Sequence, residues 1–192
     1  MEKASIGVSN DFCPQTMFLY GTYKEDGSPN FGLFSWVSYC FDGEIGVMAC
    51  IGGEKLTRDR IRANKVFSAN LVTEAILPLA DYLGNTEGYT TGKMDIPIAI
   101  EKGQALTIPI LADSPWVFEL EVTQSVPLDD SEIYICKIRN TLADKSLLDG
   151  SVPVAERMAA MSPVFSGGGT HYFGWNGAHK SAWGGLKEQI KP

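Results

Sequence analysis

The sequence lacks any long hydrophobic run. No apolar stretch approaches the roughly 20 residues that an α-helix needs to cross a bilayer, and the polar N-terminus lacks the apolar centre of a signal peptide. We therefore expect no membrane association and a cytoplasmic location. Hydrophobic residues make up 44% and charged residues 20% of the 192 residues. This composition is typical of one folded globular domain with a sizeable core.

Positive charge is also scarce. The formal net charge is −7, which argues against a nucleic-acid partner, because such partners normally bind a basic face. A small anionic ligand remains compatible with this charge if the basic residues are concentrated in one place.

Groups for metal or nucleophilic chemistry are few. The chain has four scattered cysteines without C-x-x-C spacing, and we expect them to be small buried core residues rather than metal ligands: Cys13, Cys40, Cys50 and Cys136. Because the only histidines are His171 and His179, a Ser-His-Asp triad or a His-metal site would need one of them. No metal site and no catalytic residue is predicted, and a flavin-free hydrolase is disfavoured.

Strand signals dominate the sequence. A first strand over residues 15–24 ends at turn formers, and Asp42-Gly43 is a strong hairpin signal between strands 31–41 and 44–51. In residues 116–124, apolar and polar side chains alternate, which predicts a strand with one wet face. Further strands are expected at residues 66–73, 106–111 and 133–142.

Two short helices interrupt these strands. One is predicted over residues 57–64, beginning near Thr57 as a capping residue, and one over residues 74–83, with Pro78 in its first turn or at a kink. Residues 84–103 are glycine-rich and predict a long ordered loop with one helical turn. About seven strands with one or two helices favour a small closed or nearly closed barrel. We expect a single domain over residues 1–192, with a core over 14–145 and an irregular arm over 150–192.

The most informative stretch runs from a strand end through Gly52 and Gly53 into the first helix. Free backbone N–H groups and the positive end of the helix dipole form a natural phosphate pocket there. Lys55 and Arg58 would add charge and Thr57 a hydroxyl group. The alternative is that Thr57 is an ordinary N-cap and the arginines form a solvated helix face. The stretch is neither a P-loop nor a G-x-G-x-x-G fingerprint.

Two other segments have side chains suited to ligand binding. Ser35 and Ser38 stand among aromatic residues, so a flat ring could lie against the backbone while the hydroxyls donate hydrogen bonds. In the long loop, Gly92 permits close backbone approach and Lys93 could reach a phosphate or a ring oxygen. The alternatives are a barrel strand with water-facing serines and a plain surface loop.

The order and spacing of these features resemble the flavin reductase family with the FMN-binding split barrel, and flavoredoxin-like members in particular. The resemblance spans roughly residues 14–145. Its matching motifs are Asp26-Gly27-Ser28-Pro29-Asn30, the segment 35–38, Lys55-Leu56-Thr57, Phe67-Ser68-Ala69-Asn70 and Thr91-Gly92-Lys93, with a fainter match at Ser162-Pro163-Val164 and residues 171–175.

The resemblance implies a mainly β, Greek-key antiparallel split barrel that binds FMN non-covalently as a homodimer. The hydroxyl-rich strand and the following strand end would hold the flavin ring and ribityl chain. The Lys-x-Thr turn would hold the phosphate, and the Thr-Gly-Lys loop would close on the flavin. These roles fall on Ser35, Trp36, Val37, Ser38, Cys50, Ile51, Gly52, Lys55, Thr57, Asn70, Thr91, Gly92 and Lys93.

The implied function is an oxidoreductase that carries electrons from NAD(P)H or a reduced redox partner through FMN to a flavin or another acceptor. Many family members carry Gly-Asp-His where this chain has Asp129-Asp130-Ser131-Glu132, and the second lysine that often follows the Ser-Gly-Lys loop is missing. In some members that histidine lies near the nicotinamide. The alternative is therefore a non-catalytic flavin- or haem-binding carrier or sensor on the same barrel.

Overall fold

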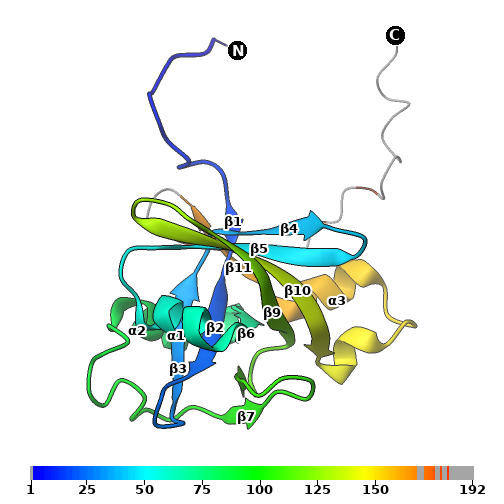
Figure 1. Cartoon of the computed structure of the whole chain (residues 1–192). Helices are drawn as coiled ribbons and strands as arrows, with labels where there is room; N and C mark the ends of the chain where they lie inside the picture. The colour runs from blue at the N-terminus through cyan, green and yellow to red at the C-terminus, as the bar shows by residue number, and fades with distance from the viewer. Residues whose placement is uncertain (1, 168–170, 176–177, 179–180, 182–192) are drawn as a thin grey trace.

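The computed structural model describes residues 2–167, 171–175, 178 and 181. Its centre is a seven-stranded antiparallel sheet in the order β3-β2-β6-β9-β10-β5-β4 (Figure 1). The Asp42-Gly43 hairpin prediction is confirmed, because β4 and β5 pair across that turn. The strands of this sheet are β2 (Phe18–Tyr23), β3 (Pro29–Phe34), β4 (Val37–Phe41), β5 (Ile45–Gly52), β6 (Val66–Leu71), β9 (Trp116–Pro127) and β10 (Ser131–Ala143).

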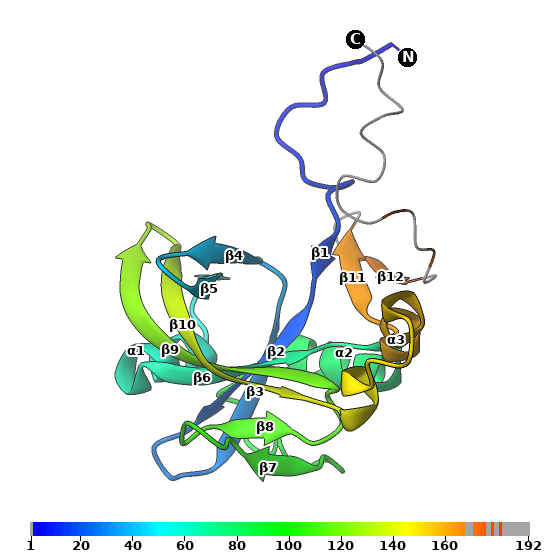
Figure 2. The ribbon, with the colours of Figure 1, turned by 90° about the vertical axis from the view of Figure 1, so that its right-hand side faces the viewer.

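The prediction of one strand over residues 31–41 is wrong. The chain bends at Ser35 and Trp36 and forms two strands, β3 and β4, which occupy opposite ends of the sheet order. Only two residues join these ends, so the sheet has to curl round, as Figure 2 shows. The Cys50 N–H donates to the Trp36 carbonyl at 2.9 Å across the bend. The mainly β, antiparallel barrel expected from the sequence is thereby confirmed.

The helices lie close to their predicted places. α1 spans Leu56–Asn64, and a short 3₁₀ turn, η1 (Glu74–Ile76), leads into α2 (Leu77–Asn85) with Pro78 in its first turn. The predicted loop 84–103 ends in a short strand, β7 (Ile100–Lys102), which pairs with β8 (Pro109–Leu111). No helix of the part of the chain that the structure describes is both long and apolar enough to span a bilayer.

The core fills the barrel and the space between the sheet and α2. Phe67, Leu120 and Tyr134 are fully buried inside the barrel. The predicted wet face of residues 116–124 is wrong at Glu119, which is 0% exposed. Its carboxylate accepts hydrogen bonds from the backbone N–H groups of residues 104–106, at 2.7–2.9 Å, and from Asn140 Nδ2 at 2.9 Å. A loop therefore covers this position, and the charge is satisfied by the hydrogen bonds it accepts.

The C-terminal arm is more regular than predicted. After η2 (Lys145–Leu148), it contains α3 (Val154–Met161), β11 (Val164–Gly167) and β12 (His171–Gly174). β11 pairs with β1 (Gln15–Thr16) and with β12 in a small second sheet. All four cysteines are free. Cys136 is buried as predicted and Cys40 and Cys50 are half-buried, but Cys13 is exposed, because the N-terminal segment before β1 lies outside the core.

Candidate functional site

The site begins at the corner between β5 and α1. Gly53 takes φ +68°, a left-handed conformation that favours glycine, and its N–H donates to the Asp130 carbonyl at 2.7 Å. This N–H is therefore not available to a ligand. No side chain of the described residues caps α1 at Lys55. The first-turn N–H groups, at the positive end of the helix dipole, are thus left for an external acceptor.

Thr57 is not the N-cap that one interpretation of the sequence assumed. It lies inside the first turn and is 4% exposed, and its Oγ1 accepts a hydrogen bond from Asn30 Nδ2 at 3.0 Å. Because Oγ1 already accepts this bond, its own hydrogen is free to donate. Asn30 Oδ1 is buried and has no partner among the described residues.

Lys93 reaches the same corner from the long loop. Lys93 is 4% exposed, and its Nζ donates a hydrogen bond to the Phe31 carbonyl at 2.7 Å. Burial lowers the pKa of its ammonium group to about 8. An ammonium has three N–H donors, so two remain after the bond to Phe31. Within the described part of the chain, no carboxylate forms an ion pair with Lys93. A buried cation without an anionic partner fits an anionic ligand.

Lys55, Thr57 and Lys93 line one small cavity of about 40 Å³. Lys55 is partly exposed, and its Nζ lies 3.9 Å from Glu87 Oε1. The structure therefore brings together three predicted residues from two separate motifs. Their donors and positive charges, beside an uncapped helix start, suit a phosphate group. Arg58 does not line this cavity.

A second hollow, of about 290 Å³, lies beside the bend between β3 and β4. Its lining includes the predicted residues Trp36, Val37, Ser38 and Cys50. Trp36 is exposed, and a Cβ added at Gly52 would lie 3.3 Å from its ring. The indole thus lies over the end of β5. This hollow offers an aromatic face and a serine hydroxyl to a flat ring.

The other predicted residues do not line either cavity. Ile51 is fully buried in the core, and Ser35 is half-buried at the bend. Asn70 Nδ2 donates to the Leu19 carbonyl at 2.8 Å and its Oδ1 accepts from the Leu111 N–H at 2.8 Å, so both ends of its amide are occupied. Thr91 and Gly92 are exposed on the loop. His171 is exposed on β12, and His179 lies outside the described residues.

Sequence reasoning missed four other residues that line the hollow, which are Asn10, Gln15, Met48 and Ile133. Met48 lies two residues before Cys50 on β5, on the same face of the strand, and Cys50 is in register with Ile133 of β10. The sequence does not reveal the register between β5 and β10, and that register was needed to find Ile133.

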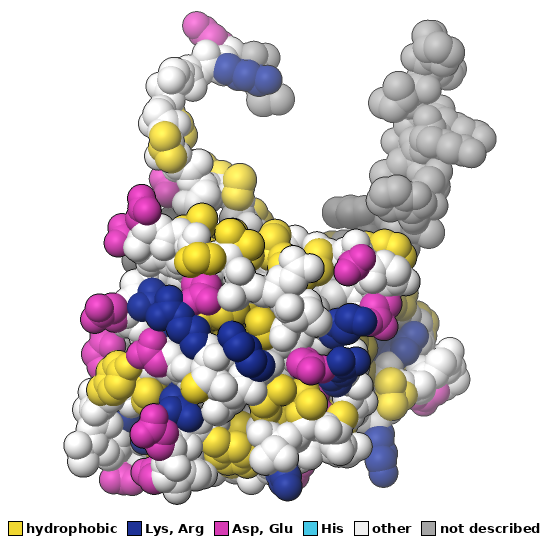
Figure 3. All heavy atoms as spheres, in the orientation of Figure 1, with side chains coloured by type: hydrophobic (Ala, Val, Ile, Leu, Met, Phe, Trp, Pro, Cys, Tyr) yellow, Lys and Arg dark blue, Asp and Glu magenta, His cyan; other side chains and the backbone are white. Residues whose placement is uncertain are grey.

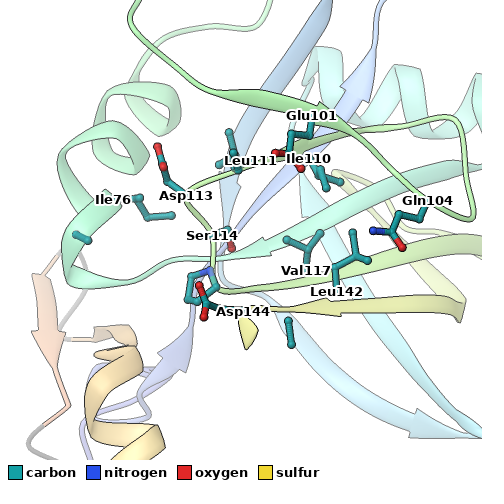
Figure 4. Close-up of a pocket in the computed structure, with 14 residues that line it drawn as sticks. Ile76, Glu101, Gln104, Ile110, Leu111, Asp113, Ser114, Val117, Leu142 and Asp144 are labelled. Carbon is teal, nitrogen blue, oxygen red and sulfur yellow. The ribbon is translucent and has the colours of Figure 1, made fainter. Parts of the chain in front are cut away.

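A larger cavity of about 620 Å³ contains none of the predicted residues (Figure 4). It lies by β7, β8 and the start of β9, and its lining includes the carboxylates of Glu101, Asp113 and Asp144. Three carboxylates would repel a phosphate. Size alone therefore does not identify the candidate site, and we place it at the corner and the hollow.

Comparisons with known proteins identify the family and the fold of the chain. The family model described as flavin reductase like domain matches residues 10–156. No curated protein matches the sequence. The fold is similar to flavoredoxin of Desulfovibrio vulgaris (Miyazaki F), with a TM-score of 0.84 and 21% identity over 95% of this chain and 98% of that one.

Two further solved structures have the same fold. Flavoredoxin from Methanosarcina acetivorans gives a TM-score of 0.85 at 18% identity, covering 99% of this chain and 100% of its own. Nitrilotriacetate monooxygenase component B from Bacillus cereus gives 0.80 at 10% identity, covering 94% and 100%. At these identities the similarity shows a shared fold.

Proposed function

Because the chain belongs to the flavin reductase-like family, we propose that it is an FMN-binding oxidoreductase. Electrons would pass from NAD(P)H or a reduced redox protein through FMN to a free flavin or another acceptor. Bound FMN supplies the hydride and electron-transfer chemistry. The observation that carries the proposal is the buried Lys93 ammonium beside Thr57 and Lys55 at the uncapped start of α1.

The two cavities suit the two ends of FMN. At the corner, Lys55 and Lys93 neutralise the phosphate, and Thr57 and the first-turn N–H groups donate hydrogen bonds to it. At the hollow, Trp36 offers its ring face and Ser38 its hydroxyl to the isoalloxazine. Cys50 and Lys55 are five positions apart in the sequence, so no more than about 18 Å of extended chain separates them. One elongated ligand can therefore reach both places.

The carrier alternative has one specific observation in its favour. Where many family members have Gly-Asp-His, Glu132 is buried and its carboxylate pairs with Arg62 Nε, while the Asp130 carbonyl accepts the Gly53 N–H. Acidic residues, not an imidazole, therefore border the corner. This arrangement favours a flavin-binding carrier or sensor without turnover of its own.

We further propose that two copies of the chain associate through the outer face formed by β4, β5, β10 and the end of β9 that carries Val126. Trp36, Met48 and Val126 are exposed apolar side chains, and β4 ends the main sheet in the described part of the chain. In Figure 3 yellow hydrophobic side chains gather over β4 and β5 along the upper border of the face that carries α1. Exposed apolar surface next to an unpaired strand edge favours association. Light scattering coupled to size exclusion should give a dimer, and Met48→Glu should weaken it.

Reconstitution tests the proposed function. FMN-free protein is incubated with excess FMN and desalted, and its visible spectrum and its oxidation of NADH and NADPH are measured. We expect retained flavin in the wild type and in Lys102→Met, an exposed-lysine control on β7, and a clear loss in Lys93→Met. Colourless wild-type protein would refute the proposal. Flavin-loaded protein that oxidises neither nicotinamide would exclude NAD(P)H as the electron donor and leave a reduced redox protein as the donor or the carrier alternative.

A further inference from the structure

We propose that the mouth of the barrel holds a second site, which binds a neutral aromatic small molecule. The site is a chamber of about 470 Å³ bordered by β2, β4, β9, α3 and β11. We call it the mouth chamber. It contains none of the residues that line the corner cavity. Its volume falls within the roughly 300–1,000 Å³ typical of small-molecule sites, which often occupy the mouths of β-barrels.

Aromatic side chains form one wall of the mouth chamber. Phe118 lies at their centre, with ring centroids 6.1 Å from Phe18, 6.2 Å from Trp116 and 6.3 Å from Tyr39. The planes of Trp116 and Tyr39 are inclined at 80° and 86° to Phe118. Rings arranged in this way present both edges and faces to the space between them. A planar aromatic ligand can then pack in the offset or edge-to-face geometry that aromatic rings prefer.

None of the residues that line the mouth chamber carries a charged side chain, although 20% of the residues of the chain are charged. An ionised ligand would lose its hydration without gaining a partner, which is costly. Gln15, Thr16, Ser38 and Tyr39 supply neutral polar groups. Burial raises the pKa of the Tyr39 phenol, so its hydroxyl keeps its proton and can donate. The chemistry therefore fits a neutral ring that carries one or two hydrogen-bonding groups.

α3 forms part of one side of the mouth chamber. None of its residues is fully buried, and Met158 and Met161 line the chamber. The Arg157 guanidinium of the helix donates to the Leu147 carbonyl at 2.6 Å. Just after the helix, Pro163 forms an isolated antiparallel β-bridge with Thr73. Methionine side chains are flexible and polarisable, and they adapt to ligands of different outline. This side of the chamber can therefore adapt its shape to a bound small molecule.

β4 separates the mouth chamber from the hollow proposed for the flavin ring. Gln15, Val37 and Ser38 border both spaces, whereas the chamber's aromatic wall belongs to it alone. Binding in the chamber does not require flavin. The site can therefore be tested in FMN-free protein, and it stands even if the FMN proposal fails.

The test uses N-phenyl-1-naphthylamine, a neutral aromatic probe that fluoresces in apolar surroundings. We expect saturable binding of one probe per chain in the FMN-free full-length protein. 1-Naphthol should displace the probe at least tenfold more effectively than 1-naphthoate, which has the same ring system and a negative charge. Binding without saturation, or equal displacement by the two compounds, would overturn the proposal.

Variants on α3 locate the bound probe. Met158→Trp places a large ring in the mouth chamber and should weaken probe binding at least tenfold, whereas Ala160→Trp, on the exposed side of the same helix, should leave it within twofold. Met161→Trp provides a second filled variant if Met158→Trp does not fold, and circular dichroism checks each protein. Equal probe affinity in the filled and control variants would place the probe elsewhere and disprove the site.

Discussion

The pH dependence of FMN affinity tests the role of Lys93 most directly. Burial lowers the pKa of its ammonium group to about 8, and the protonated form is the one that pairs with phosphate. In the free protein the protonated fraction falls from about 90% at pH 7 to about 10% at pH 9. Bound phosphate stabilises the protonated form, so the dissociation constant should rise about tenfold over this interval. Flavin fluorescence quenching at constant ionic strength measures it.

Removing the charge should abolish this dependence. Lys93→Met deletes a charge-assisted hydrogen bond of about 1.5–3 kcal/mol, so FMN should bind roughly 10- to 150-fold more weakly at pH 7. Lys102→Met is the matched control and should keep the wild-type curve. Riboflavin lacks the phosphate and should show neither the pH dependence nor the loss. The reasoning fails if Lys93→Met retains the wild-type slope, or if riboflavin reproduces it.

Three further substitutions test the surrounding structure. Thr57→Val removes the acceptor of the Asn30 amide, so urea denaturation should show an unfolding free energy lower by about 1–3 kcal/mol, with weaker FMN binding; full stability would contradict the buried bond. Burial alone would raise the pKa of Glu119, but its four hydrogen bonds outweigh burial and lower it. Glu119→Ala should therefore destabilise the protein most above about pH 4.3, the usual glutamate pKa, and progressively less as the pH falls below it; a pH-independent loss would argue against this account. Trp36→Ala should raise the dissociation constant of FMN about 2- to 10-fold through lost ring contact, and unchanged affinity and turnover would remove Trp36 from the site.

Much of the fold was predictable because local signals and tertiary structure agree. The Asp42-Gly43 turn and the helix over residues 56–64 lie where local signals place them. The bend at Ser35 and Trp36 was not predictable, because the flanking residues continue a strand pattern and only closure of the sheet separates them. The burial of Glu119 was missed for a similar reason. Its apparent wet face is covered by a loop that passes 13 to 15 residues earlier in the chain.

The site was predictable in its parts and not in its geometry. Lys93 donates to a carbonyl 62 residues away, and no periodicity in the sequence connects those positions. The family resemblance implied only that the loop of Lys93 closes on the flavin. The role of Thr57 was ambiguous because a threonine before a helix is usually a cap. Its actual partner, Asn30, lies 27 residues earlier on β3. Such pairings depend on which strands become neighbours, and a single sequence does not reveal this.

The bend between β3 and β4 explains why several features of the site depend on one another. By joining the two ends of the sheet it closes the barrel, and it also sets Trp36 over Gly52, where a Cβ would approach the indole to 3.3 Å. β4, which starts at this bend, then has the flavin hollow on one side and the mouth chamber on the other. A ligand in either space therefore contacts the same five-residue strand. If a ligand in one space moves β4, it can change the affinity of the other space for its own ligand. Thermodynamic linkage then requires the second ligand to change the affinity for the first by the same factor.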